Sequence, residues 1–122
     1  MAKDLRISFL LDFYGDMLTE TQREVVHAYY NEDLSLAEIA QDREITRQGV
    51  RDAIKRAEQQ LLEMEDRLGL ARRFQEIQKV LTLICDCALS IQDLNEQNGQ
   101  VTGIDQNAAK ILECAQEISM EA

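Results

Sequence analysis

The feature that most constrains this chain is a seam of apolar residues, recurring three times at alternating spacings of four and three. The seams comprise Val50, Ile54, Ala57, Leu61, Met64 and Leu68; Leu70, Phe74, Ile77, Leu81, Ile84, Ala88 and Ile91; and Ile104, Ala108, Ile111, Ala115 and Ile118. This spacing keeps one side of an α-helix apolar, and it is typical of helices that pack along their length against other helices. The pattern therefore predicts three long helices.

The composition favours helix over the rest of the chain as well. The 122 residues include no proline and five glycines, and 45% of them are hydrophobic, which is enough for a packed core. A β-sandwich would need more turn-forming residues than this. We therefore expect an all-α protein. Because we find neither an apolar run long enough to cross a bilayer nor a signal-peptide pattern, we expect it to be cytoplasmic, with no membrane span.

Residues 5–14 predict the first helix. Leu5, Phe9 and Phe13 lie along one face of it, and this face is widened by Ile7, Leu11 and Tyr14. Two apolar faces on so short a helix predict that it is enclosed in a core. Gly15 is placed to end the helix in the left-handed conformation, which glycine adopts without a steric cost.

Polar residues predict where the next helices begin. Thr19 with Gln22, and Ser35 with Glu38, have the spacing of capping boxes, and Thr46 is expected to cap a fourth helix. A short capped helix, a tight turn and a longer capped helix are the parts of a helix-turn-helix.

The turn of this helix-turn-helix has two residues of note. Ile45 is expected to turn inward and pack the turn into the core. Glu44 stands where many such turns have glycine, so we expect a different turn conformation here. Ala40 is small where the two helices would cross.

Positive charge is concentrated on the second helix of this pair. The formal net charge is −10, which repels nucleic acid unless cations gather locally, and between Arg43 and Arg56 basic residues outnumber acidic ones. Arginine and glutamine near the start of such a helix can reach base edges, while cations further along meet phosphates. The candidate nucleic-acid-binding residues, on the side opposite the seam, are Arg47, Gln48, Arg51, Asp52, Lys55 and Arg56.

Asp52 leaves two functions open. Its carboxylate repels phosphate unless it pairs with Arg56 or accepts a hydrogen bond from a cytosine amine. One function is contact with DNA or RNA. The alternative is an adaptor whose helix-turn-helix binds a partner protein without touching nucleic acid. An attractive field around Asp52 would favour the first, and a mixed or negative field would favour the second.

No pattern in the chain indicates catalysis, a metal site or a cofactor. Cys85, Cys87 and Cys114 form neither a CxxC pair nor a cluster with the single histidine, His27. We expect reduced cysteines packed as small hydrophobic residues, no metal or cofactor, and no enzymatic activity. Tyr29-Tyr30 could stack on bases, but aromatic residues at the buried edge of a helix more often belong to the core.

Residues 35–61, SLAEIAQDREITRQGVRDAIKRAEQQL, resemble the promoter-binding fourth region of sigma factors. A closer resemblance is to the YlxM family of helix-turn-helix proteins, which are similar to that sigma region. The matching stretches, within residues 4–76, are Asp12-Phe13-Tyr14-Gly15, Leu18-Thr19 with Gln22, Tyr29-Tyr30 with Asp33, Ser35-Leu36 with Glu38-Ile39-Ala40, and Thr46-Arg47-Gln48 through Lys55-Arg56.

The resemblance implies a role in the signal recognition particle pathway or in its regulation, because in Gram-positive bacteria the family's genes lie beside those for components of that particle. It implies no catalytic residues. Two positions depart from the family, which more often has alanine in place of Gly49 and an aromatic residue in place of Arg51. Arg51 adds a positive charge to the candidate face.

We therefore expect two parts: a sigma-like helix-turn-helix domain over residues 1–69, and a C-terminal helical hairpin over residues 70–122 that serves as an oligomerisation segment. The hairpin loop is expected at residues 95–100, and Asp105 is expected to cap the last helix. The seams offer more apolar surface than one short chain can cover, so a homodimer is expected. DNA or RNA and components of the signal recognition particle are the other expected partners.

Overall fold

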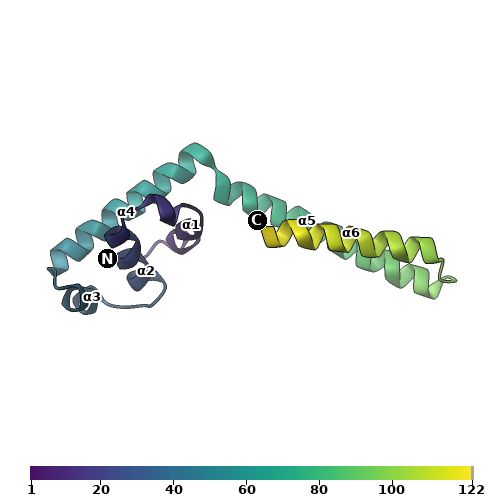
Figure 1. Ribbon diagram of the computed structural model, residues 1–122, viewed down its shortest axis with the longest axis horizontal. Coiled ribbons are helices and arrows are strands. Elements are labelled where there is room, and N and C mark those ends of the chain that lie inside the picture. Colours follow the sequence, from purple (N-terminus) through teal and green to yellow (C-terminus); the bar gives the residue numbers. More distant parts are fainter. Residues whose placement is uncertain (122) are drawn as a thin grey trace. The chain divides into compact units, whose positions relative to one another are not determined.

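The computed structural model describes residues 1–121, and this part of the chain is helical, without strands (Figure 1). The elements are α1 (Arg6–Tyr14), the 3-10 turn η1 (Gly15–Met17), α2 (Glu20–Tyr30), α3 (Leu36–Arg43), α4 (Arg47–Leu68), α5 (Leu70–Gln97) and α6 (Thr102–Glu121). The predicted class, an all-α helix-turn-helix domain followed by a helical hairpin, is confirmed.

Hydrogen bonds at the helix caps confirm the predicted starts of α2, α3 and α4. The Thr19 hydroxyl accepts from the Gln22 N–H, and the Gln22 side chain accepts from the Thr19 N–H, both at 3.2 Å. Ser35 and Glu38 make the same reciprocal pair at 3.1 and 3.2 Å. Thr46 caps α4 with its side-chain oxygen. These bonds satisfy N–H groups that the first turn of a helix leaves without a partner.

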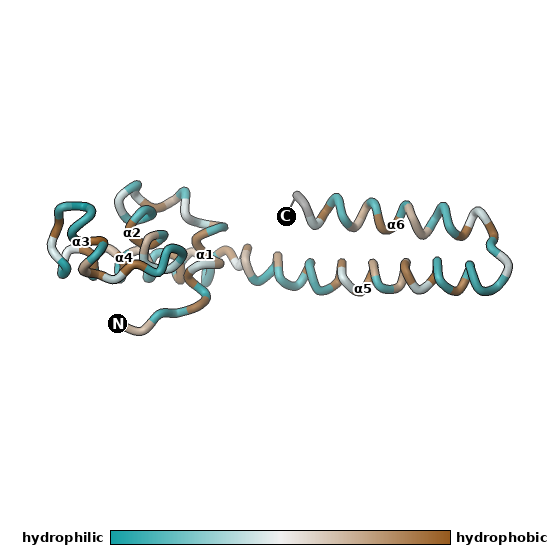
Figure 2. Tube along the Cα trace, turned by 90° about the horizontal axis from the view of Figure 1, so that it is seen from below, coloured by the Kyte–Doolittle hydropathy of each residue, from teal (hydrophilic) through white to brown (hydrophobic). Residues whose placement is uncertain are grey.

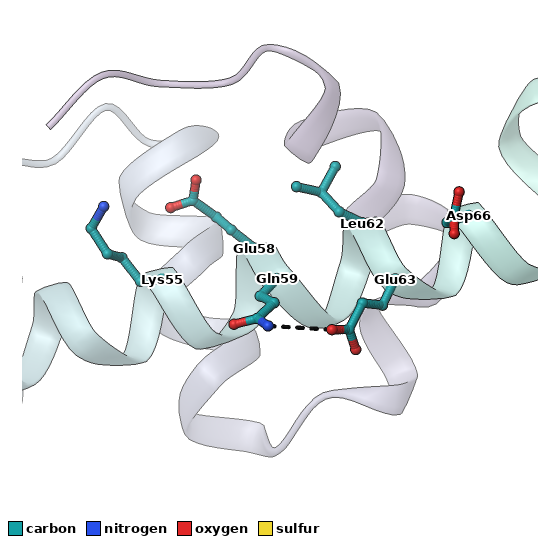
Figure 3. A pocket seen from close by; sticks show the side chains of 6 residues that line it. All are labelled: Lys55, Glu58, Gln59, Leu62, Glu63 and Asp66. Atoms are coloured by element: carbon teal, nitrogen blue, oxygen red, sulfur yellow. Dashed lines mark hydrogen bonds between the residues drawn. The ribbon is translucent and has the colours of Figure 1, made fainter.

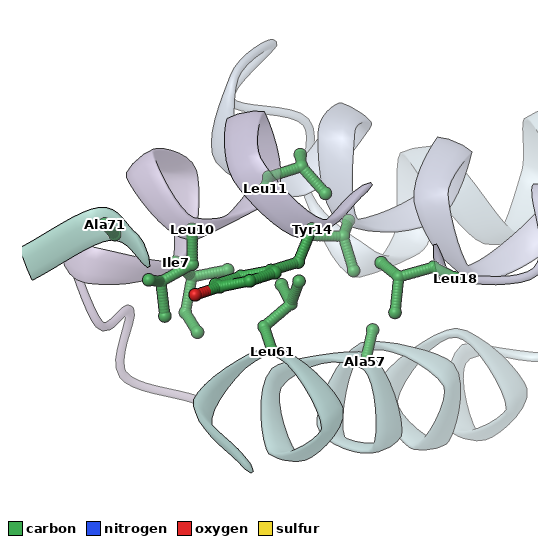
Figure 4. Close-up of a cluster of buried hydrophobic side chains, with 9 residues drawn as sticks. Ile7, Leu10, Leu11, Tyr14, Leu18, Ala57, Leu61 and Ala71 are labelled. Carbon is green, nitrogen blue, oxygen red and sulfur yellow. The ribbon is translucent and has the colours of Figure 1, made fainter. Parts of the chain in front are cut away.

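α4 is the helix on which the N-terminal unit is built. Its seam residues Val50, Ile54, Ala57 and Leu61 are fully buried, and α1, α2 and α3 all pack against it. One buried cluster joins α2 and α3 to the N-terminal half of α4, and a second joins α1 to its C-terminal half (Figure 4). The predicted seam is therefore confirmed as far as Leu61, whereas Leu68 at the end of the helix is exposed.

The predicted enclosure of α1 in the core is confirmed for Ile7, Leu11 and Tyr14, which are buried, but it is wrong for Leu5. Leu5 precedes the helix and is 86% exposed, while Phe9 and Phe13 are only partly buried. Both sides of α1 are apolar, and packing against α4 decides which side is buried more deeply. The phenylalanine rings meet edge to face at the flank, with centroids 5.1 Å apart. The buried residues of α1 are Ile7, Leu10, Leu11 and Tyr14.

Gly15 ends α1 as predicted, but it does not adopt the left-handed conformation. Its φ of −57° and ψ of −34° are helical, and the chain continues into η1. Close packing explains the glycine instead, because a Cβ atom at this position would lie 3.3 Å from the Leu11 side chain.

The chain divides into two compact units, and the first ends at Ala71, two residues beyond the division predicted from the sequence. The Tyr14 hydroxyl donates to Glu65 at 2.7 Å and accepts from the Leu70 N–H at 3.0 Å, while the Ala71 N–H donates to the same carboxylate at 3.0 Å. Gly69, with φ of 64°, ends α4. The first turn of α5 belongs to the N-terminal unit because its N–H groups are satisfied there.

The second unit, from Arg72 onward, contains the rest of α5 and the antiparallel α6 (Figure 1). Over residues 72–119, whose burial the structure describes, the buried apolar residues are Leu81 and Ala88 in α5 and Ala108 and Ala115 in α6. Three of these four are alanines, so the hairpin has a thin core of its own. Hydrophobic and hydrophilic residues alternate along both helices (Figure 2).

The hairpin loop is shorter than predicted, and the predicted cap at Asp105 is wrong. α5 continues to Gln97, and α6 begins at Thr102. The buried Asn95 amide donates to the Val101 carbonyl at 2.8 Å and to the Asp105 carboxylate at 2.9 Å, and it accepts from the Val101 N–H at 3.0 Å. Asp105 therefore serves the buried amide, and this polar contact sets the register of the two helices.

No helix within residues 1–121 is both long and apolar enough to cross a membrane. The cysteines are free thiols, with Cys85 partly buried and Cys87 and Cys114 exposed. The expectation that they pack as small hydrophobic residues is therefore wrong for Cys87 and Cys114 within a single chain.

We expect Tyr14→Phe to lower the free energy of unfolding by about 1–2 kcal/mol, because Glu65 and the Leu70 N–H lose a partly buried partner. Burial, together with the bond to Glu65, raises the pKa of the Tyr14 phenol, so the hydroxyl stays a donor over the whole pH range of the experiment. Urea unfolding followed by circular dichroism measures the change. Tyr29→Phe is the matched control, since the Tyr29 hydroxyl donates to Met1 at the chain start. Equal losses in the two variants would contradict the role given to Tyr14.

Candidate nucleic-acid interface

α3 and α4 form a helix-turn-helix around a small apolar contact. Ile39 and Ala40 of α3 and Val50 and Ile54 of α4 are buried in one cluster, together with residues of α2. Ala40 lies at this contact as predicted, where a small side chain lets the two helices approach. The arrangement holds one side of α4 against the core and leaves the other side in solvent.

The turn between the two helices uses the left-handed conformation, so the expectation of a different turn is wrong. Glu44 has a φ of 57° and a ψ of 39°, and its N–H donates to the Ala40 carbonyl. The Ile45 N–H donates to the same carbonyl at 3.1 Å. The side chain of Ile45 does not pack inward, since the residue is 41% exposed. Ile39 and Val50 already fill this corner of the core.

The six candidate residues lie on the exposed side of the N-terminal half of α4. Each is exposed, and the buried Val50 and Ile54 are on the opposite side of the helix. The positive end of the helix dipole lies at this same end. The six are Arg47, Gln48, Arg51, Asp52, Lys55 and Arg56.

Gln48 and Asp52 are bonded to each other within this face. The Gln48 amide donates to the Asp52 carboxylate at 2.9 Å, so the structure gives Asp52 a different partner from the Arg56 considered in the sequence. An amide carries no net charge, and it leaves the negative charge of Asp52 in place. The face holds this one carboxylate among four cations, so its net charge is positive and its field attracts phosphate, although Asp52 weakens the attraction.

Arg43 belongs to the same basic run but has another role. Its guanidinium forms an ion pair with Glu24 of α2, which ties the end of α3 to α2. This leaves the cations of α4 as the candidates for contact with phosphate.

The C-terminal half of α4 is acidic. A groove of about 520 Å³ runs along its outer side, and the Gln59 amide within it donates to Glu63 at 3.3 Å (Figure 3). Of the residues that line this groove, the candidate site predicted from the sequence includes Lys55 but none of the acidic ones, although acidic residues at helical spacing after Arg56 signal them. Phosphate is attracted at the start of α4 and repelled further along. The groove is lined by Lys55, Glu58, Gln59, Leu62, Glu63 and Asp66.

Tyr29 and Tyr30, considered for base stacking, are held within the fold. Their rings meet edge to face with centroids 5.3 Å apart, and the Lys3 ammonium lies 4.6 Å from the Tyr29 centroid. The Tyr30 hydroxyl donates to Glu58 at 3.0 Å and accepts from the Asp4 N–H at 3.2 Å. Burial, with Glu58 beside it, raises the pKa of Tyr30 to about 12. Both rings therefore anchor the N-terminal segment.

Among the residues that the structure describes, no group of three His, Cys, Asp or Glu side chains is placed to hold a metal ion. The exposed His27 lies near the end of α2, where its Nδ1 is hydrogen-bonded to the Asn31 side chain at 2.8 Å.

The helix-turn-helix agrees with a match to the family model UPF0122, described as "Putative helix-turn-helix protein, YlxM / p13 like", over residues 1–101. The chain belongs to this family. The UPF0122 protein of Bacillus thuringiensis (strain Al Hakam) is 41% identical over 101 residues, covering 83% of this chain and 92% of the relative. The UPF0122 protein of Desulforamulus reducens is 39% identical over 116 residues, covering 93% and 96%. The resemblance to the YlxM family is confirmed.

Gly49, one of the two departures from the family pattern noted above, lies at the cap of α4. Its N–H donates to the Thr46 hydroxyl at 2.9 Å, and a Cβ atom at this position would lie 3.1 Å from the same oxygen. An alanine here would therefore require a small shift of the cap. Glycine leaves the cap relaxed, although it costs the helix up to about 1 kcal/mol relative to alanine.

We expect Glu44→Gly to raise the free energy of unfolding by about 1 kcal/mol, because glycine adopts a φ of 57° without the steric cost that a Cβ atom brings. Glu44→Ala is the control, since it removes the same charge and keeps the Cβ atom. Thermal unfolding of the two variants and the parent chain checks this. A gain of equal size in both variants would show that charge, and not backbone conformation, is responsible.

Proposed function

We propose that this UPF0122-family protein is a regulator that binds DNA or RNA through the start of α4, acting as a homodimer in the cytoplasm and without enzymatic activity. The observation that carries the proposal is the exposure of four cations at the start of a helix held by a helix-turn-helix. In helix-turn-helix proteins the second helix enters the major groove, with its N-terminal residues at base edges. The four are Arg47, Arg51, Lys55 and Arg56.

The positions of these side chains on α4 indicate which of them would contact bases and which would contact phosphates. Arg47 and Gln48 are in the first turn of α4, where they can reach base edges. Gln48 would exchange its bond to Asp52 for a bond to a base. Arg51, Lys55 and Arg56 are further along and would contact phosphates, which position the helix without reading sequence.

The balance of charge supports modest affinity for one chain. Four cations release at most about four counterions, whereas Asp52, the acidic half of α4 and the net charge of −10 act against binding. A homodimer would bring two such helices to one nucleic acid and raise the affinity without any new contact.

The proposed setting is the signal recognition particle pathway. Support for this setting comes from the resemblance to the YlxM family, whose genes lie beside those for components of that particle. Regulation of such genes, or contact with the particle's RNA or protein, would each fit.

An adaptor with no nucleic-acid contact is the second candidate function, and the acidic groove on α4 favours it. Glu58, Glu63 and Asp66 surround the partly buried Leu62 there. An acidic groove with an apolar floor suits a basic segment of a partner protein.

We expect log K for binding to a labelled duplex to fall with log salt at a slope of about −4 per chain or shallower, measured by fluorescence anisotropy. Arg51→Ala with Lys55→Ala should remove most of this binding. Arg67→Ala with Lys79→Ala is the matched control, since it removes the same two charges from exposed positions elsewhere. If both pairs weaken binding equally, overall charge is responsible and the α4 face is not the site.

We expect Asp52→Asn to strengthen nucleic-acid binding several-fold, a gain of about 1 kcal/mol or less, by deleting a repulsive charge while leaving an oxygen that can accept from Gln48. Asp66→Asn, at the acidic end of α4, is the control and should change binding less. If nucleic acid is never retained, and Asp52→Asn instead abolishes binding to a protein of the signal recognition particle, the adaptor is the correct function.

A further inference from the structure

The hairpin of α5 and α6 leaves many of its larger apolar side chains exposed. Six isoleucines, three on each helix, are 37–49% exposed. Grooves of about 350 and 500 Å³ connect the two helices along this side, the first bringing Ile118 beside Ile77 and the second bringing Ile111 beside Ile84. We call this surface the isoleucine face; it comprises Ile77, Ile84, Ile91, Ile104, Ile111 and Ile118.

The isoleucines are arranged in layers across the two helices. Ile77 lies beside Ile118 and Ile84 beside Ile111, and seven-residue steps along both antiparallel helices continue this register to Ile91 and Ile104. Seven residues are two turns of a packed helix, so the layers follow one another at equal intervals. Each layer consists of two isoleucines, so the order of layers along the hairpin is unchanged when its direction is reversed.

Small side chains form most of the interior between α5 and α6. Leu81, Ala88, Ala108 and Ala115 form the apolar interior, next to the polar Asn95. Alanine side chains bury little apolar area, and two helices joined by such an interior are marginally stable in water. The hairpin therefore needs a further apolar contact.

The opposite side of the hairpin carries more polar residues. Gln78 accepts a hydrogen bond from the Ser119 hydroxyl at 3.0 Å. A groove further along is lined mainly by polar residues, among them Gln92, Glu96 and Asp105. Pairing of the isoleucine face with the same face of a second copy occupies that surface on both chains, so it closes at two copies.

We propose that the isoleucine face is covered by the same face of a second copy, so that two hairpins form a four-helix bundle. This deepens the homodimer of the proposed function by naming its interface. A two-fold axis in the plane of the face places isoleucine layers against isoleucine layers, because the row of layers reads the same from both ends. The charged residues at the edge of the isoleucine face have both signs, because Arg73, Glu76 and Lys110 lie beside the grooves. Two copies can therefore approach each other without a net repulsion between like charges.

The size of the face meets what a stable dimer requires. The 20 residues of α6 extend for about 30 Å, and two packed helices are about 20 Å wide. One face therefore covers roughly 600 Å², and two copies bury roughly 1,200 Å², which is the lower bound for specific stable interfaces. The exposure of Cys114, which lines the second groove, has the same explanation, because a second copy would cover that groove.

Sedimentation of the full chain at micromolar concentration tests the proposal. The parent chain should show twice the mass of one chain. Ile84→Lys places two uncompensated charges at the centre of the interface, and it should raise the dimer dissociation constant roughly a hundredfold or more. Leu89→Lys is the matched control: it makes the same change at an exposed leucine on another side of α5, and it should remain dimeric.

Circular dichroism shows whether each variant stays helical, and Ile111→Lys repeats the test from α6. The unfolding temperature of the parent chain should also rise with protein concentration, which requires no variant. A monomeric parent chain, a dimeric Ile84→Lys variant, or equal dissociation of Ile84→Lys and Leu89→Lys would each overturn the proposal. Arg51→Ala with Lys55→Ala should lose nucleic acid and stay dimeric, so failure of the nucleic-acid function and failure of this interface are told apart.

Discussion

The burial of one side of α4 is the interaction on which the rest of the N-terminal unit depends. Val50 and Ile54 hold α2 and α3, and Ala57 and Leu61 hold α1, so a single helix carries both clusters of the core. Because this side faces inward, the candidate cations of the same helix face outward. The core and the candidate site thus occupy two sides of one helix. A substitution that shifts the buried side of α4 would also shift the exposed cations.

The field along that outer side changes sign. Cations and the positive helix end lie at the start of α4, Asp52 lies among them, and the groove around Glu63 is acidic. A nucleic acid can therefore use only the beginning of the helix, whereas a basic protein segment could use its end. The two candidate functions concern different parts of one surface, which is why variants in the two parts can separate them.

The hairpin solves a different problem of burial. Its interior consists largely of alanine, with Asn95 bonded on both sides to set the register, and its isoleucines lie outside. A small interior lets two helices approach closely, but it stabilises them weakly. Pairing through the isoleucine face would supply the missing apolar contact, and the resulting dimer would contain two copies of α4.

The sequence by itself determined the features that rest on neighbours along the chain. The capping boxes of Thr19 and Ser35 and the exposed positions on α4 follow from spacing, because a helix relates residues a few positions apart in a regular way. Only the tertiary structure decided which apolar residues of α1 are fully buried, that Glu44 takes the left-handed conformation, and that Tyr14 extends the first unit to Ala71. Each of these features depends on side chains brought together from distant segments or on the closing of a turn against the core. Contacts of this kind leave no regular spacing in the sequence from which they could be predicted.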